Sequence, residues 1–146
     1  MNVKPQSLAQ IIAILESSGN PLAMRYEPEY VPSGASIVVY SQIAQVSTDT
    51  ARVCLATSWG LYQIMGQNLI GLGVDVSFPA YCMSIYLQHK SFADFLAHNG
   101  LAKYAAMPLA DFLSDDSAVL DFATIYNGPG NPAAYAAAIK RIGGQS

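Results

Sequence analysis

The first clear pattern along the chain is a row of apolar residues at helical spacing. These residues fit one buried helix face, and they are Leu8, Ile11, Ile12 and Leu15. Ser7 and Gln10 have the spacing of a capping box, which satisfies free backbone N–H groups of the first turn. The turn-forming residues 17–21 then stop the helix. The pattern predicts a helix that ends on Glu16, at the border of its apolar face.

The next segment, residues 22–47, lacks a regular pattern. Its prolines argue against a helix, and residues 36–40 form a short run with high strand propensity. We therefore expect an irregular segment that includes at most one small hairpin. Residues 48–56 predict a short helix, with Thr48 or Asp49 as its cap.

Helical patterns return in the second half of the chain. The longest predicted helix spans 79–98, with a proline in its first turn and Gly100 just beyond its end. Residues 114–116 cap another helix, which ends at the turn 127–130. The pair Asn131 and Pro132 starts the last helix. The chain is therefore predicted to be mainly α, with a small irregular or β-containing segment.

Length and composition place the chain among globular proteins. Its 146 residues suit one domain, 1–146. Hydrophobic residues make up 52% of the chain and charged residues 12%, and this composition excludes a disordered chain. The net charge of −3 gives no sign of a nucleic-acid-binding surface. No apolar run approaches the roughly 18 residues of a membrane span, so we expect no stable membrane insertion. No signal-peptide pattern opens the chain. The two cysteines, Cys54 and Cys82, lack zinc-type spacing, and Cys82 falls on an apolar helix face, so we expect buried free thiols. We expect no metal and no cofactor.

Glu16 is the first candidate for chemistry. A carboxylate in the last turn of a helix faces the negative end of the helix dipole. If the side chain is also partly desolvated, both effects raise its pKa, and a carboxyl that keeps its proton near neutral pH can act as a general acid. The alternative is a surface glutamate at a helix end.

A second candidate region is 56–68, which mixes aromatic, small and amide residues. One interpretation is a buried helix start with a core tryptophan. The other is a cleft wall, where Trp59 and Tyr62 offer flat apolar surface and Gln63 and Asn68 offer hydrogen bonds. Sugars need this combination, because their ring faces are apolar and their edges carry hydroxyls.

Tyr126 is the third candidate, because helical spacing points it inward at the end of its helix. A buried tyrosine hydroxyl needs a partner, and a buried carboxyl is a suitable one.

Three motifs in order resemble the lysozyme-like superfamily, in particular soluble lytic transglycosylases and goose-type lysozymes. The glutamate–serine helix end is matched by 16–21, the G-L-M-Q segment by 58–65, and the Y-N-A-G-P-G turn by 126–130. The segments 58–66 and 125–129 look more closely like the SSWG-F-QIMG and RYNGP motifs of phage-type N-acetylmuramidases. The F-E-x-H element of those enzymes resembles 26–29, with Glu29 in place of the histidine.

The resemblance implies a lysozyme-like domain with a small irregular or β flap over a glycan cleft. Glu16 would protonate the glycosidic oxygen of the β-1,4 bond between N-acetylmuramic acid and N-acetylglucosamine. A hydrolase would also use a second carboxylate, Glu27 first and Glu29 second, whereas a transglycosylase would need Glu16 alone. Tyr126 would orient Glu16 or the sugar. The expected substrate-binding residues are Ser17, Ser58, Trp59, Tyr62, Gln63, Met65 and Asn127.

The function implied is a peptidoglycan-degrading muramidase of the endolysin type. The enzyme alternative is a lytic transglycosylase that leaves 1,6-anhydro-muramic acid ends. The non-enzyme alternative is a glycan-binding or virion structural domain. We expect a monomer that binds peptidoglycan glycan strands and no nucleic acid. We further expect it to be made in the host cytoplasm without a signal peptide and to act on the cell wall in the periplasm, or from a virion.

Overall fold

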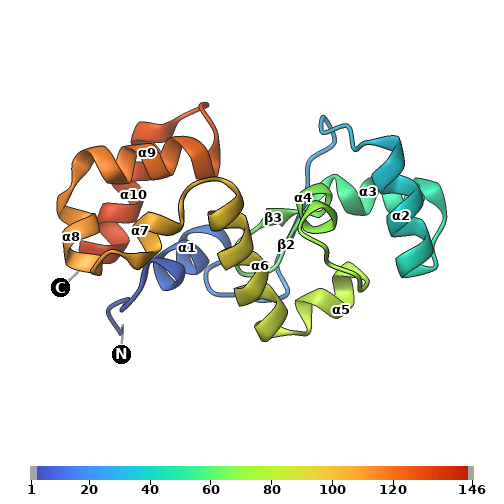
Figure 1. Ribbon diagram of the computed structural model, residues 1–146, viewed down its shortest axis with the longest axis horizontal. Helices are drawn as coiled ribbons and strands as arrows, with labels where there is room; N and C mark the ends of the chain where they lie inside the picture. Colours follow the sequence, from blue (N-terminus) through green and yellow to red (C-terminus); the bar gives the residue numbers. More distant parts are fainter. Residues whose placement is uncertain (1–2, 145–146) are drawn as a thin grey trace. The chain divides into compact units, whose positions relative to one another are not determined.

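The computed structural model describes residues 3–144, and the chain divides into two compact units (Figure 1). Unit 1 contains the residues up to Gly19 and those from Phe95 onward, and unit 2 contains Asn20–Asp94. Helices dominate, and one three-stranded antiparallel sheet lies in unit 2. The mainly α fold class with a small β element is therefore confirmed.

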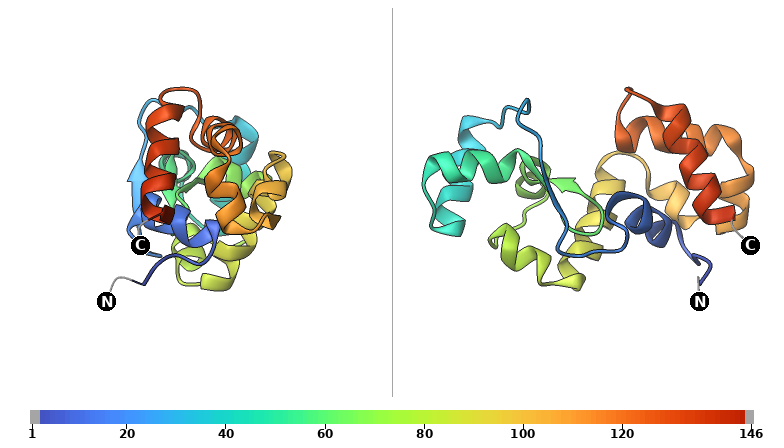
Figure 2. Two further views of the ribbon diagram at one scale, coloured as in Figure 1. Left: turned by 90° about the vertical axis from the view of Figure 1, so that its left-hand side faces the viewer. Right: turned by 180° about the vertical axis from the view of Figure 1, so that it is seen from behind.

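Unit 1 is a group of helices around an apolar core. These are α1 (Leu8–Ser17), α7 (Ala102–Ala106), α8 (Leu109–Ser114), α9 (Asp116–Asn127), α10 (Pro132–Gly144) and the last residues of α6 (Ile85–His98). The core side chains Ile11, Phe112, Phe122 and Ile139 are 0% exposed. Helices α1 and α10 come from opposite ends of the chain and pack against each other (Figure 2). A Cβ added to Gly143 would lie 2.7 Å from Ile11, so the missing side chain permits this approach.

Helix α1 forms as its sequence predicts. The Ser7 hydroxyl accepts a hydrogen bond from the N–H of Gln10 at 3.2 Å, and the Gln10 side chain accepts one from the N–H of Gln6 at 2.6 Å. The helix ends at Ser18, which has the left-handed φ of 54° and donates its N–H to Ile14 at 3.0 Å. The prediction of a helix that ends around Glu16 is confirmed.

Unit 2 combines short helices with the sheet. Its helices are α2 (Gly34–Ala44), α3 (Thr48–Leu55), α4 (Gly66–Gly71), α5 (Phe78–Cys82) and the first part of α6. Its strands are β1 (Met24–Tyr26), β2 (Thr57–Trp59) and β3 (Ile64–Met65), in the order β1-β2-β3. Strand β2 is thus the central strand, and β1 lies at an edge.

The prediction of an irregular segment over 22–47 was wrong from 34 to 44, where the chain forms α2. The Ser33 hydroxyl accepts the N–H of Ser36 and caps the helix. Tyr40 stacks on Phe78, with ring centroids 4.0 Å apart, and its hydroxyl accepts the N–H of Phe78 at 2.9 Å. Burial of this helix face against the rest of unit 2 outweighs the strand propensity of the β-branched residues in 36–40.

Two further predictions need correction. Residues 56–68 are not a helix start, because the strands β2 and β3 form a hairpin there before α4 begins. The single helix over 79–98 is broken into α5 and α6. The break lies at Ser84, whose hydroxyl accepts the N–H of Leu87 at 3.2 Å and so caps a new helix.

The smaller predictions mostly agree with the structure. The short helix α3 is present, although Ser47 caps it in place of Thr48 or Asp49. Asp115 caps α9 as predicted from 114–116. Both cysteines are free thiols, as expected. Among residues 3–144, no helix combines the length and apolar character that a membrane span requires.

Candidate functional site

The candidate acid Glu16 lies in the last turn of α1 and is half-buried. The hydroxyl of Tyr135 donates a hydrogen bond to its Oε1. The two residues are 119 positions apart in the sequence, so this contact exists only in the folded protein.

Helix packing explains why Tyr135 reaches Glu16. Asn131 begins α10, since its side-chain oxygen accepts the N–H of Ala134 at 3.3 Å. Tyr135, Ile139 and Gly143 then follow at intervals of four residues and share one helix face. Gly143 contacts Ile11 near the start of α1, and Tyr135 contacts Glu16 near its end. Helices α1 and α10 therefore run antiparallel.

The Tyr135 hydroxyl keeps the proton that it donates to Glu16. Burial raises the pKa of Tyr135 far above its usual range, and the negative charge of Glu16 raises it further. The tyrosine therefore keeps its proton at any physiological pH. Its hydrogen bond restricts the rotation of the Glu16 carboxyl group and fixes the direction of Oε1.

Tyr126 packs in the aromatic cluster around this pair. Its ring stacks on Phe122 at 5.3 Å between centroids, contacts Tyr135 at 6.4 Å and meets Phe95 edge-on at 5.5 Å. Helix α9 places it there, one residue before the helix ends at Asn127. The structure thus places Tyr126 against the ring of Tyr135, whose hydroxyl binds Glu16. The catalytic role of Tyr126 stays a prediction.

Two other candidates of unit 1 lie at helix ends. Ser17 follows Glu16, and its hydroxyl donates to the carbonyl of Ala13 at 2.9 Å. Asn127 is exposed at the end of α9. Their roles in substrate binding stay predictions.

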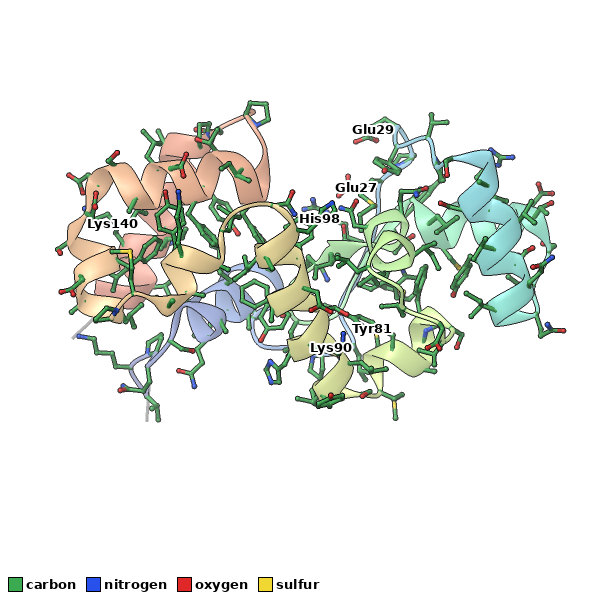
Figure 3. All side chains as sticks on the ribbon, in the orientation of Figure 1. Glu27, Glu29, Tyr81, Lys90, His98 and Lys140 are labelled. Atoms are coloured by element: carbon green, nitrogen blue, oxygen red, sulfur yellow. The ribbon has the colours of Figure 1, made fainter. Side chains whose placement is uncertain are left out.

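Glu27 directly follows strand β1 in unit 2, and its side chain is labelled in Figure 3. The Nε and Nη2 atoms of Arg25 both lie 2.6 Å from its Oε1. The Glu27 side chain is 23% exposed, against 76% for Arg25, and Glu29 is exposed. Of the two candidate second carboxylates, Glu27 is therefore the one held in a defined orientation by a charged partner.

The hairpin residues Ser58, Trp59 and Tyr62 are largely buried, at 5%, 5% and 2% exposure. The Trp59 indole N–H donates to the carbonyl of Cys54 at 2.9 Å. Tyr62 stacks on Phe92, with centroids 4.1 Å apart. The core tryptophan of the first interpretation of 56–68 is thus confirmed. The contacts of these three residues with a sugar stay predictions. Their burial indicates that they stabilise the hairpin.

Gln63 and Met65 are the partly exposed residues of this hairpin. Gln63 has a left-handed φ of 50°, and its Nε2 donates to the carbonyls of Ala23 at 3.2 Å and Gly60 at 2.9 Å. These bonds fix the amide of Gln63 at the turn that joins β2 to β3. The predicted role of both residues as subsite lining is compatible with their exposure and remains a prediction.

Gln88 of α6 holds the same turn from the other side and is 0% exposed. Its Oε1 accepts the N–H of Leu61 at 2.7 Å, and its Nε2 donates to the carbonyls of Pro21 at 3.2 Å and Cys82 at 2.9 Å. A Cβ on Gly60 would lie 2.3 Å from this Oε1, and Gly60 has φ 77°, so the turn requires glycine there.

Sequence reasoning missed the roles of Tyr135 and Gln88. Tyr135 was visible only as one residue of a helix packing face, and nothing local indicates a partner 119 residues away. Gln88 lies in a helical pattern where a polar residue suggests exposure. Within the described part of the chain, no group of three or more histidine, cysteine or acidic side chains could hold a metal ion.

Comparison with known proteins identifies the family. The N-acetylmuramidase family model matches residues 26–143. The chain belongs to the N-acetylmuramidase family. It is also 37% identical to the endolysin of Enterobacteria phage PRD1 over 131 residues, which cover 84% of this chain and 86% of the relative. No solved structure matches the chain significantly. The resemblance to phage-type muramidases is therefore confirmed, and the protein is a peptidoglycan-degrading glycosidase.

The matched range has one consequence for the site. It includes Glu27, Tyr126 and Tyr135, but it begins ten residues after Glu16. The assignment of Glu16 therefore depends on its contact with Tyr135 and on its motif.

Proposed function

We propose that Glu16 is the general acid of this muramidase. The observation that carries the proposal is the hydrogen bond from the hydroxyl of the half-buried Tyr135 to Glu16 Oε1. A general acid must present its proton in a fixed direction, and this bond orients the carboxyl group. The position of Glu16 at the carboxyl end of α1 also favours its protonated form.

The proton transfer follows from this geometry. Oε1 accepts the Tyr135 hydroxyl, so the proton that Glu16 delivers is carried by Oε2. It passes to the glycosidic oxygen between N-acetylmuramic acid and N-acetylglucosamine. The bond from that oxygen to C1 of the muramic acid then breaks, and the N-acetylglucosamine leaves as an alcohol. Tyr126 supports the step by packing on the Tyr135 ring.

The second half of the reaction assigns a role to Glu27. As a base, Glu27 would take a proton from water, and the resulting hydroxide would attack C1 of the muramic acid to give a reducing end. Glu27 is favoured over Glu29 because Arg25 holds its carboxylate. In the transglycosylase alternative, Glu16 takes the proton back from the muramyl 6-hydroxyl, which attacks C1 and leaves a 1,6-anhydro end.

The biological setting proposed here follows from the named relative. The PRD1 protein is an endolysin, so we propose that this protein also degrades the wall of a bacterial host during phage release. We propose that it acts as a monomeric catalytic domain on the glycan strands.

Mass spectrometry of soluble fragments from purified peptidoglycan tests the reaction. We expect reducing muramic acid ends, which are heavier by two hydrogens and one oxygen than 1,6-anhydro ends. Glu16→Gln should abolish release while the folded state stays intact, and the exposed Asp75→Asn serves as a control for loss of a carboxylate. Full activity of a folded Glu16→Gln protein would remove Glu16 from the mechanism. Anhydro ends would establish the transglycosylase reaction.

A further inference from the structure

Gln88 of α6 is a fully buried amide that the proposed reaction does not use. It is 0% exposed, although glutamine side chains are mostly exposed in folded proteins. In the described part of the chain it bonds to three backbone groups, which are the N–H of Leu61 and the carbonyls of Pro21 and Cys82. One side chain therefore connects the turn between β2 and β3, the segment before β1 and the end of α5.

The amide of Gln63 is held by the same two segments that Gln88 connects. Its Nε2 donates to the carbonyl of Gly60 at 2.9 Å and to that of Ala23 at 3.2 Å. Gln88 accepts the N–H of the residue directly after Gly60. It also donates to the carbonyl of Pro21, which lies two residues before Ala23. Both anchors of the Gln63 amide thus lie next to backbone groups that Gln88 holds.

The turn depends on these contacts for its conformation. A Cβ added to Gly60 would lie 2.3 Å from Oε1 and 2.9 Å from Cδ of Gln88, so the turn packs directly on the buried amide. Gln63 has a left-handed φ of 50°, which is uncommon for a residue other than glycine. Such a conformation persists where the surrounding structure determines it. Loss of the Gln88 bonds should therefore loosen the turn and Gln63 with it.

The bonds of Gln63 leave its Oε1 for a ligand. Two carbonyl oxygens face Nε2, so this is the donor end of the amide, and Oε1 is directed away from both. No hydrogen bond to Oε1 occurs among residues 3–144, and the Gln63 side chain is partly exposed. An acceptor in a fixed orientation matches a donor of an N-acetylated sugar, either a hydroxyl or the acetamido N–H.

We propose that Gln88 is a positioning residue for glycan binding. It holds the turn 60–63, and the turn orients the acceptor that Gln63 presents to the sugar. Gln88 acts through Gln63, because its own side chain is 0% exposed. The inference rests on the proposed cleavage of glycan strands and deepens it, because it links sugar binding to a buried residue outside the three muramidase motifs.

Gln88→Met tests this role, because methionine is similarly long and unbranched but cannot replace the three hydrogen bonds. KM and kcat would be measured on soluble peptidoglycan strands that carry no cross-links. We expect Gln88→Met and Gln63→Ala each to raise KM about two- to tenfold, the effect of one hydrogen bond between neutral groups, with kcat near the wild-type value. The double variant should raise KM no further than Gln63→Ala alone, because Gln88 acts through Gln63.

Tyr40→Phe is the matched control for a loss of stability. It also removes the buried side-chain acceptor of a backbone N–H in unit 2, that of Phe78, but it does so away from the turn. Urea unfolding would be measured for both variants, and Tyr40→Phe should keep the wild-type KM. If Gln88→Met does not fold, Gly60→Ala disturbs the same contact from the side of the turn and should also raise KM.

Several outcomes would overturn the proposal. They are a KM of Gln88→Met within about twofold of wild type, or an equal rise in Tyr40→Phe. An unchanged KM in Gln63→Ala, or rises that add in the double variant, would overturn it as well. The proposed reaction is judged separately, because it requires an active wild type and an inactive, folded Glu16→Gln whatever the KM values of these variants are.

Discussion

The hydrogen bond between Tyr135 and Glu16 allows a sharp test by Tyr135→Phe. This change deletes one hydroxyl and keeps the ring that contacts Tyr126. The carboxyl group of Glu16 would then lose the donor that orients Oε1. We expect kcat to fall because the proton is no longer presented in a fixed direction, and KM to stay near the wild-type value.

The structure sets the size of the effect. Glu16 delivers its proton from a neutral carboxyl group, and a hydrogen bond between neutral groups contributes about 0.5–1.5 kcal/mol. About 1.4 kcal/mol corresponds to a tenfold change in rate, so we expect kcat to fall by up to about tenfold.

The assay is the rate of reducing-end release from purified peptidoglycan. It is measured between about pH 4 and 9, the range in which carboxyl groups and most catalytic bases titrate. Tyr104→Phe is a matched control in the same unit, since the Tyr104 hydroxyl donates to the exposed Asp121 at 2.5 Å. The control should keep wild-type kcat. An unchanged kcat in Tyr135→Phe, or an equal loss in Tyr104→Phe, would refute the reasoning.

Three other substitutions test the rest of the site and its support. Glu27→Gln should lower hydrolysis by orders of magnitude in the fragment assay, and an unchanged rate would favour a mechanism with Glu16 alone. Gln88→Leu should lower the free energy of unfolding in urea by about 2–4 kcal/mol, because it removes three hydrogen bonds of a fully buried amide, to the N–H of Leu61 and to the carbonyls of Pro21 and Cys82. Gly66→Ala should lower it by about 1–3 kcal/mol, because the new Cβ would lie 2.5 Å from the carbonyl oxygen of Cys54. Gly71→Ala in the same helix meets no atom within 4 Å and should not destabilise.

Local signals predicted the elements whose ends are determined by neighbouring residues. Ser7 and Gln10 cap α1, and Asp115 caps α9, through bonds that span three or four residues of chain. The apolar spacing of α1 also placed Glu16 at its end. Where a cap and an apolar face lie close together in the sequence, the pattern suffices.

Neighbouring residues do not determine the conformation where distant packing decides it. The run 36–40 has strand propensity, yet it forms part of α2 because Tyr40 stacks on Phe78, which is 38 residues away along the chain. The break between α5 and α6 depends on Ser84, whose hydroxyl could have stayed inside a longer helix. Neither outcome is visible in a window of neighbouring residues.

The candidate site depends on the same long-range packing. Glu16 was predictable from its helix and motif, whereas Tyr135 becomes its partner only when α10 packs antiparallel to α1. That packing needs Gly143, since a side chain there would meet Ile11 and Leu113 at 2.7 Å. The last helix carries none of the motifs that indicated a muramidase, but it supplies the donor that orients the proposed acid. A change that loosens α10 from α1 should therefore reduce kcat before it unfolds the chain.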